Sequence, residues 1–533
     1  MRGKKIICVI VAALMTITVF TGCSGKDKEA DPKATSDKSE VNLTGYPIVK
    51  EPITLNILSG KTDQPDFNEM PLFKDYEKKT NIHINWTLAG DDIGEKVSIL
   101  LATNDLPDVI MKNYFSDTDL VRYGSMGTFV GLNDLIDKYA PNYKKLQEQY
   151  PQIPKAMNMG GNEYSMPYIC LSDSVKIRKS YINKKWLDAV GIKMPTTLDE
   201  YYEVLKAFKT KDPNGNGKND EIPLGGTDIS SITTSLYGAF GLMNRGANNG
   251  YVDEDPKNPE KLRFYRADDN MKQLLQYVNK LYKEGLIDKN IFTANLNTFS
   301  ANGDKNVYGA HNILPTFIGP KCQDDFVALD APLKGPNGDQ IWGYVLGTVF
   351  TKGSFVITKD NKYPEATMRW VDYFYSEEGS NEFCLGQEGK TYTKTADGKY
   401  ELTDYVTKNP DGLNLDQVLA KFTPYGGGAN PTVITDDNFK GAETYKTSMD
   451  GTPKFKKYVP DEIWEIFSLT PEEAEQFNGV AADLQTLITQ SEAKFITGEL
   501  PFSEWDNYVA KLKKAGMDEY VKIKQAAYDR YKK

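Results

Sequence analysis

The stretch Ile53-Thr-Leu-Asn-Ile-Leu58 and the segments that follow it decide the fold of this chain. It is a short apolar run typical of a buried strand, and Ile82 to Thr87 and Pro107 to Met111 repeat the pattern. Between these runs, Phe67 to Lys79 and Ile93 to Thr103 have the apolar spacing of helices. Strand and helix alternate, which predicts an α/β fold with a doubly wound sheet and right-handed crossovers.

Ligands of such sheets bind beyond the carboxyl ends of the strands, here the segments after Leu58 and after Met111. We therefore expect one wall of a ligand cleft to contain Gly60, Lys61, Asp63 and Asn113 to Ser116. No GxGxxG or Walker loop opens any of the predicted helices, so nucleotide binding is not indicated.

Length and composition limit the function further. A chain of 533 residues, 26% of them charged, can bury a sizeable core and should divide into at least two lobes. The net charge of -10 and the lack of a basic stripe argue against nucleic acid as a partner, and we expect a monomer. The 32 Tyr, 23 Phe and 6 Trp are numerous enough to supply both a core and flat faces on which sugar rings stack.

Catalytic and thiolate-metal signatures are missing from the sequence. The cysteines are Cys8, Cys23, Cys170, Cys322 and Cys384, and none forms a CxxC pair or a zinc spacing. The two histidines, His83 and His311, lie far apart, and no GxSxG, HExxH or SxxK has suitable context. We therefore expect a binding protein and not an enzyme. Whether two of the last three cysteines pair is left open.

Residues 1 to 22 have the parts of a secretory signal, with basic residues followed by an apolar run from Ile6 to Phe20. That run is shorter than the about 20 apolar residues that span a bilayer. The junction before Cys23 resembles a bacterial lipobox, whose cysteine receives a diacylglycerol that carries acyl chains such as palmitate. Residues 23 to 50 are polar and predict a lipid-anchored, disordered tether. The alternative is a plain signal peptide with an incidental Cys23.

Oxygen-bearing side chains at alternate positions distinguish the segment from Asp212 to Pro223, with Gly217 at the sharp turn. This spacing matches the first three quarters of an EF-hand calcium loop. The ligands would be Asp212, Asn214, Asn216, the carbonyl of Lys218, and Asp220. Pro223 occupies the twelfth position, so Glu221 is the only nearby carboxylate that could complete the set.

A capped helix, Thr197 to Thr210 with Glu200 three residues after its cap, precedes this loop, and no helix follows it. We interpret the loop as a structural Ca²⁺ clip and not as a switch. The alternative is a polar Asn-Gly turn that binds no metal.

Several motifs carry a family resemblance that extends over nearly the whole mature chain. They include Leu101-Ala-Thr-Asn-Asp-Leu-Pro-Asp108, Glu163-Tyr-Ser-Met-Pro-Tyr168, Tyr181-Ile-Asn-Lys-Lys-Trp186 and Arg369-Trp-Val-Asp-Tyr-Phe-Tyr-Ser-Glu-Glu-Gly379. The chain resembles the extracellular solute-binding proteins of family 1, in the lipoprotein branch that binds oligosaccharides such as alginate and aldouronates. The resemblance implies a periplasmic-binding-protein-like fold: two α/β lobes, a hinge of crossover strands, and a ligand cleft between the lobes.

The resemblance also implies partners and a metal. Members of this family are the receptors of ABC importers and act with permease subunits. Alginate-binding members carry a similar loop, which implies Ca²⁺ ligands at Asp212, Asn214, Asn216, Lys218, Asp220 and Glu221.

From the position of apolar and Gly/Pro-punctuated segments, we expect crossings near Pro167 to Val175, Val307 to Ile318 and Leu346 to Phe355. Lobe 1 would then contain 51–167 and 319–345. Lobe 2 would contain 168–318 and 346–533, including the C-terminal helices.

Candidate sugar-binding residues are the aromatics near the expected crossings: Tyr168, Tyr237, Trp342, Tyr344, Tyr392 and Tyr425. Core burial is the alternative for Trp342, and a surface turn is the alternative for Tyr425. Arg178 could grip a uronate carboxylate with its guanidinium fork or, alternatively, form an internal salt bridge.

The sequence thus predicts a lipid-anchored receptor on the extracellular face of the membrane, which captures an oligosaccharide between two closing lobes and delivers it to a permease. The alternatives are a peptide receptor of the same architecture, and a surface polysaccharide-binding protein not coupled to transport.

Overall fold

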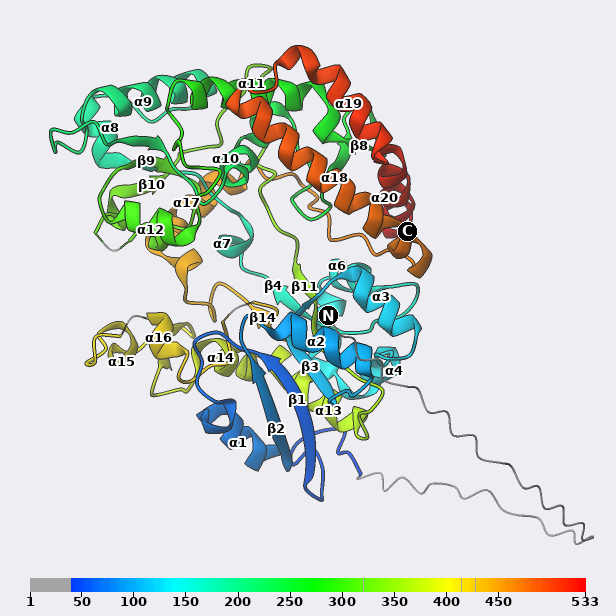
Figure 1. Cartoon of the computed structure of the whole chain (residues 1–533). Helices are drawn as coiled ribbons and strands as arrows, with labels where there is room; N and C mark the ends of the chain where they lie inside the picture. Colours follow the sequence, from blue (N-terminus) through cyan, green and yellow to red (C-terminus); the bar gives the residue numbers. More distant parts are fainter. Residues whose placement is uncertain (1–39, 320, 414, 427) are drawn as a thin grey trace, which may run out of the picture. The chain divides into compact units, whose positions relative to one another are not determined.

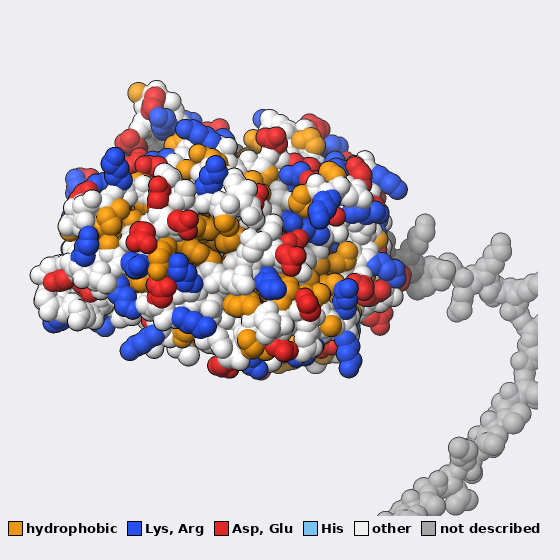
Figure 2. Space-filling view, turned by 90° about the horizontal axis from the view of Figure 1, so that it is seen from above, with side chains coloured by type: hydrophobic (Ala, Val, Ile, Leu, Met, Phe, Trp, Pro, Cys, Tyr) orange, Lys and Arg blue, Asp and Glu red, His pale blue; other side chains and the backbone are white. Residues whose placement is uncertain are grey.

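The computed structural model describes residues 40–319, 321–413, 415–426 and 428–533 (Figure 1). The predicted signal segment, Cys23 and most of the predicted tether lie outside these residues. In the part of the chain that is described, no helix is both long and apolar enough to cross a membrane. On the face shown in Figure 2, acidic and basic side chains are interspersed.

Lobe 1 is built on a sheet of order β14-β4-β11-β3-β1-β2. Its strands are β1 (Ile53–Gly60), β2 (Ile82–Ala89), β3 (Val109–Phe115), β4 (Met166–Cys170), β11 (Val349–Ile357) and β14 (Val433–Ile434). β1 pairs in parallel with β2 and β3, whereas β11 is antiparallel to both β3 and β4. The predicted alternation of strand and helix at the start of the chain is confirmed.

Helices pack against this sheet and around a core that contains Trp370, which is 1% exposed. They are α1 (Pro71–Thr80), α2 (Ile93–Thr103), α3 (Asp117–Ser125), α4 (Asn133–Tyr139), α5 (Pro141–Gln149), α6 (Gln152–Met157), α13 (Pro364–Asp372) and α14 (Glu377–Leu385). Two short helices, α15 (Asp404–Thr407) and α16 (Leu415–Leu419), pack around a separate small cluster of Val406, Val418 and Leu419. A small hairpin, β12 (Tyr392–Lys394) and β13 (Tyr400–Leu402), lies on the same lobe.

Lobe 2 is built on a sheet of order β10-β5-β9-β6. Its strands are β5 (Tyr181–Asn183), β6 (Ile222–Leu224), β9 (Tyr308–His311) and β10 (Phe326–Ala328), with a separate hairpin of β7 (Val252–Asp255) and β8 (Asn258–Phe264). Its helices are α8 (Lys184–Val190), α9 (Leu198–Thr210), α10 (Ile229–Leu236), α11 (Asp269–Lys283), α12 (Leu296–Gly303), α17 (Lys446–Lys456), α18 (Pro471–Thr497), α19 (Trp505–Lys514) and α20 (Met517–Tyr531). The predicted cap of α9 is confirmed, because Thr197 and Glu200 form a capping box.

Strand pairing corrects the predicted lobe boundaries. β10, within the predicted lobe 1 segment 319–345, pairs with β5 of lobe 2. β11, within 346–533, pairs with β3 and β4 of lobe 1, and β14 pairs with β4. The prediction was wrong because an apolar run identifies a strand but not the sheet that it joins.

The crossings follow from the same pairings. The chain passes between the sheets after β4, where α7 (Asp173–Lys176) lies, again before β11, and a third time between β14 and α17. The first two passages overlap the predicted crossings at 167–175 and 346–355. The predicted crossing at 307–318 is not one, because it contains β9, an inner strand of the lobe 2 sheet.

One segment between α17 and α18 is bound to the crossing strand β11. The Glu465 carboxylate accepts the backbone N–H groups of Thr348 at 2.6 Å and Val349 at 3.1 Å. Lys352, 2% exposed, donates to Asp117 at 2.6 Å, to Ser468 Oγ at 3.0 Å and to the Ile466 carbonyl at 3.1 Å. Lys352 therefore joins a lobe 1 helix to the chain that leads into the long helix of lobe 2.

Replacement of Lys352 by Met should lower the free energy of unfolding by about 1 to 3 kcal/mol, since it leaves buried acceptors without a donor. The exposed Lys359, at the end of the same strand, serves as control, and Lys359→Met should change stability by less than about 0.5 kcal/mol. Denaturant unfolding of both variants measures this. Equal stability of the two would show that the Lys352 cluster contributes nothing.

Candidate ligand cleft and calcium loop

A hollow of about 530 Å³ separates residues of lobe 1 from residues of lobe 2, which belong to one compact unit. Lobe 1 contributes Thr62, Asp63 and Gln64, directly after β1, and Asp416 from α16. Lobe 2 contributes Phe317 from η4 (Pro315–Ile318). The remaining wall is made by Tyr425 and Gly426 and, on the third crossing, by Phe439, Lys440 and Glu443. Of the residues expected on this wall, Asp63 lines the hollow, whereas Gly60, Lys61 and Asn113 to Ser116 are not among its lining residues.

The loop at 424–430 is held against lobe 1 by one buried lysine. Lys112, 4% exposed on β3, donates to the carbonyls of Pro424 at 2.8 Å and Gly426 at 2.5 Å, and to Asn430 Oδ1 at 2.6 Å. Burial lowers the pKa of Lys112 to about 7, whereas three oxygen acceptors match the three N–H donors of the charged form.

Gln64 fixes the same loop from the other side. Its amide donates to the Tyr425 carbonyl at 2.8 Å and accepts the Thr62 N–H at 2.6 Å. A Cβ at Gly426 would lie 2.3 Å from Gln64 Nε2, so this close approach requires glycine. The segment after β1 is therefore bound directly to Pro424 and Tyr425 of this loop.

Aromatic rings supply the flat surfaces of the cleft. The Tyr425 hydroxyl bonds to that of Tyr168 at 2.6 Å, and the Tyr425 ring also lies 5.4 Å from Phe439. On the opposite side Phe317 lines the hollow and is 37% exposed, so part of its ring is open to a ligand. Sugar rings stack on exposed faces of this kind.

An ion pair marks the lobe 2 side of the cleft. Arg178 Nη1 lies 3.6 Å from Glu443 Oε1, and the two side chains are 27% and 18% exposed. The positive charge of Arg178 also acts on Tyr344, whose pKa is raised chiefly by burial. Trp342 lies behind this wall, and its indole N–H donates to the Arg178 carbonyl at 2.7 Å.

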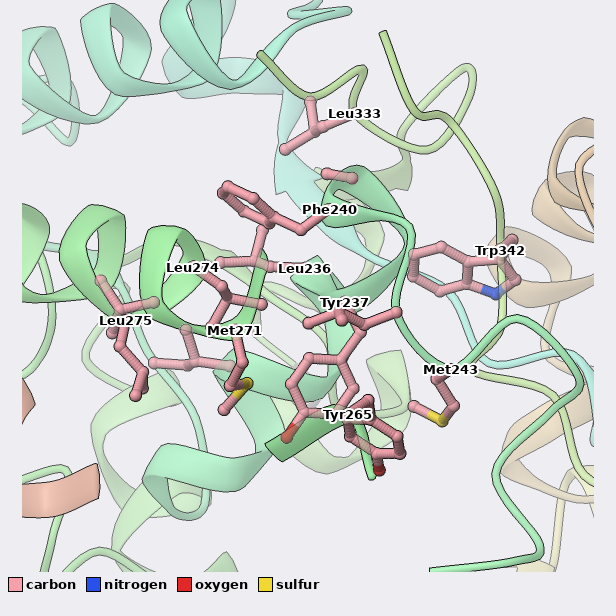
Figure 3. Packing of buried hydrophobic residues seen from close by; sticks show 14 of the residues in the cluster. Leu236, Tyr237, Phe240, Met243, Tyr265, Met271, Leu274, Leu275, Leu333 and Trp342 are labelled. Carbon is pink, nitrogen blue, oxygen red and sulfur yellow. The ribbon is translucent and has the colours of Figure 1, made fainter. Parts of the chain in front are cut away.

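The structure brings together only part of the predicted sugar-binding set. Tyr425 lines the hollow, Tyr168 bonds to the Tyr425 hydroxyl, and Arg178 pairs with the lining residue Glu443. Tyr344 is not among the lining residues and packs against the lobe 2 core. Trp342 and Tyr237 are 2% and 1% exposed and are packed in the lobe 2 core, as Figure 3 shows. Tyr392, 4% exposed, lies in the β12–β13 hairpin of lobe 1. These three present no face to the hollow.

Other cleft residues carry no local sequence signal. Phe317 was assigned to a crossing, and Glu443 and Phe439 lie in a segment without periodicity. Gln64 is an isolated polar residue whose role depends on a loop 361 positions later. The Pro and Gly residues that flank Phe317 are the one sequence signal that could have predicted an exposed turn there.

The predicted calcium loop folds with its oxygens turned inward. The Asp212 carboxylate accepts the N–H groups of Asn216 at 3.1 Å and Gly217 at 2.9 Å, and Gly217 has φ +71°. Asp220 Oδ1 accepts the Asn216 side-chain amide at 3.0 Å.

The surroundings of the Glu221 carboxylate indicate whether a cation fits this loop. Its Oε1 is buried with no hydrogen-bond partner, and its pKa is raised by burial and by the negative charges of Asp212 and Asp220. Three carboxylates that repel one another around an orphaned oxygen are what a bound cation would stabilise. Within the described residues, no group of three His, Cys, Asp or Glu side chains has the arrangement of a metal site, so the set depends on the Asn and carbonyl oxygens as well.

The described cysteines, Cys170, Cys322 and Cys384, are buried free thiols. Burial raises their pKa values, that of Cys322 to about 11. They form no disulfide, which answers the question that the sequence left open.

Comparison with known proteins agrees with this architecture. The fructooligosaccharide ABC transporter substrate-binding protein FusA of Streptococcus pneumoniae is 30% identical over 98% of this chain and 97% of its own length. The lipoprotein LipO of Bacillus subtilis is 26% identical over 97% of each chain.

Solved structures match over the same extent. FusA in complex with kestose has a TM-score of 0.74 and 28% identity, and covers 90% of this chain and 99% of FusA; a FusA EF-hand mutant in complex with fructo-nystose gives the same values. The alginate-binding protein AlgQ2 without calcium ion has a TM-score of 0.71 and 26% identity, over 90% of this chain and 99% of AlgQ2. The chain has the two-lobe periplasmic-binding-protein-like fold of these proteins.

The family model for bacterial extracellular solute-binding proteins matches residues 63–381. With the two sheets, the crossing strands and the cleft between the lobes, this match shows that the chain belongs to the bacterial extracellular solute-binding proteins.

Proposed function

We propose that this protein is the receptor of an ABC importer and that it binds an oligosaccharide in the cleft between its lobes. The observation that carries the proposal is the cleft itself: about 530 Å³ of space, walled from both lobes by aromatic rings and by hydroxyl, amide and carboxylate groups. Pockets of this size and composition suit a ligand with several hydroxyl groups and apolar ring faces. Relatives over the full length, such as FusA, support the same function.

Binding is proposed to occur without catalysis. Contacts from Thr62 to Gln64 on one side and Phe317 on the other would form together only when the lobes are close. A ligand that touches both walls would therefore favour the closed state by its differential affinity, and the closed state would be the form that the permease recognises.

Replacement of Phe317 by Ala should weaken oligosaccharide binding by about 1 to 3 kcal/mol, since it removes a stacking surface. Phe292 is a matched control: it is also 37% exposed but does not line the cleft, and Phe292→Ala should leave affinity unchanged.

A thermal-shift screen of plant, algal and microbial oligosaccharides and a peptide mixture identifies the ligand class, and calorimetry on the best ligand then compares the variants. A response to peptides alone would show that the ligand is a peptide and not an oligosaccharide, while the proposed receptor function would still hold. Equal losses of affinity in Phe317→Ala and Phe292→Ala would show that Phe317 does not contact the ligand.

We further propose that Asp212, Asn214, Asn216, the Lys218 carbonyl, Asp220 and Glu221 hold a structural Ca²⁺. The orphaned Oε1 of Glu221 and the effect of the Asp212 and Asp220 charges on its pKa support this, as does the existence of an EF-hand in FusA. When bound, the cation would neutralise the loop and fasten the end of α9 to β6.

Added Ca²⁺ should raise the melting temperature of the protein, because the ion binds only the folded loop. Asp212→Ala should lower the melting temperature and abolish its dependence on Ca²⁺. Asp188→Ala, at an exposed carboxylate of the same lobe, should retain that dependence. A response to Ca²⁺ that survives in Asp212→Ala would place the ion elsewhere.

We also propose that Cys23 carries a diacylglycerol that tethers the protein to the outer face of the cell membrane. The lipobox-like junction supports this, as does the full-length similarity to the lipoprotein LipO.

Expression in a bacterial host that processes lipoproteins, with labelled palmitate in the medium, should give labelled protein in the membrane fraction. Cys23→Ala should abolish the label and release the protein from the membrane fraction. Cys8→Ala should keep the label and stay in the membrane fraction. Labelled Cys23→Ala protein would contradict this attachment site.

A further inference from the structure

Three of the charged side chains that line the cleft are acidic and one is basic. Asp63, Asp416 and Glu443 carry carboxylates, whereas Lys440 is the lining cation among the described residues. Burial lowers the pKa of Lys440. A negatively charged ligand would thus enter a site whose lining side chains carry a net negative charge.

Arg178 lies beside the lining residue Glu443 and is the nearby side chain best suited to a carboxylate, because a guanidinium binds a carboxylate with two parallel hydrogen bonds. It is, however, already paired with Glu443. For a uronate to take Arg178, Glu443 would have to lose its partner and remain in the same partly buried space. The ion pair therefore withholds the arginine from acidic ligands.

Glu443 lies where both walls meet. It belongs to η7 (Ala442–Thr444) on the third crossing. The pKa of Tyr425, on the loop bound to lobe 1, is raised chiefly by burial and further by the negative charge of Glu443. The pKa of Tyr181, on β5 of lobe 2, is raised by the same two causes. The carboxylate is thus close to groups on either side of the cleft.

We propose that the Glu443–Arg178 pair makes this cleft selective for uncharged oligosaccharides over those that carry uronate carboxylates. The proposal rests on the function proposed above and adds the charge class of the ligand. Neutral sugars present only hydroxyl donors and acceptors, and hydroxyl groups donate well to carboxylates such as Asp63 and Asp416. Acidic sugars would face these same carboxylates with Lys440 as the one lining cation among the described residues.

The test uses pairs of sugars that differ only in charge: kestose, maltotriose and α-1,4-galactotriose, each beside its product of oxidation at the primary hydroxyl groups. Calorimetry on the wild-type protein should give a dissociation constant at least tenfold lower for the neutral member of each pair that binds. Equal affinity for both members, or preference for the acid, would overturn the proposal.

Three variants distinguish the effect of the Glu443–Arg178 ion pair from the effect of the net negative charge of the cleft. Glu443→Gln should strengthen binding of the acidic member about tenfold relative to the neutral one, since it frees Arg178. Asp63→Asn, which also removes one negative charge but frees no arginine, should change the ratio by less than threefold. The gain of Glu443→Gln should disappear in the double variant Glu443→Gln with Arg178→Gln.

An unchanged ratio in Glu443→Gln, or an equal change in Asp63→Asn, would contradict a role for the pair. If no sugar of either charge binds to the wild-type protein, the function proposed above fails, and the selectivity proposal fails with it.

Discussion

The buried ammonium of Lys112 is the interaction on which the cleft depends. It extends from the central region of the lobe 1 sheet and gathers three oxygens of the 424–430 loop, a segment more than 300 residues later. Together with Gln64, which donates to the Tyr425 carbonyl, this contact places Tyr425 beside Tyr168 and Gly426 against Gln64. The cost of burying a charge is met by complete hydrogen bonding, and the result is a wall with a defined shape.

The second constraint is the way in which the chain passes between the sheets. The three crossings give the lobes a narrow connection, and the segment at 465–468 is bound to the crossing strand β11 by Glu465 and Lys352. Two lobes joined by a few crossing segments, with lining residues on both lobes, are the arrangement that hinge closure around a ligand requires.

Local patterns predicted the elements well and the lobes less well. α2 begins and ends at the predicted residues, and the capping box of α9 follows from Thr197 and Glu200 alone. By contrast, β10 and β11 were assigned to the opposite lobes, because pairing partners far along the chain decide which sheet a strand joins.

The site shows the same division. The loop from Asp212 to Glu221 is contiguous, so its spacing could be read directly, whereas the cleft gathers Gln64, Phe317 and Glu443 from three distant segments. Trp342 illustrates the limit of composition: its position after a turn suggested a ligand platform, but its indole N–H is satisfied by the Arg178 carbonyl inside lobe 2.

Hydrogen exchange measured with and without the oligosaccharide that most raises the melting temperature tests the central claim most directly. The account predicts that the sugar slows exchange of backbone amides at 62–64, 316–318 and 441–443 together, because these segments form the two walls and the crossing between them. Protection confined to another surface, with these three segments unchanged, would show that the ligand binds outside the cleft.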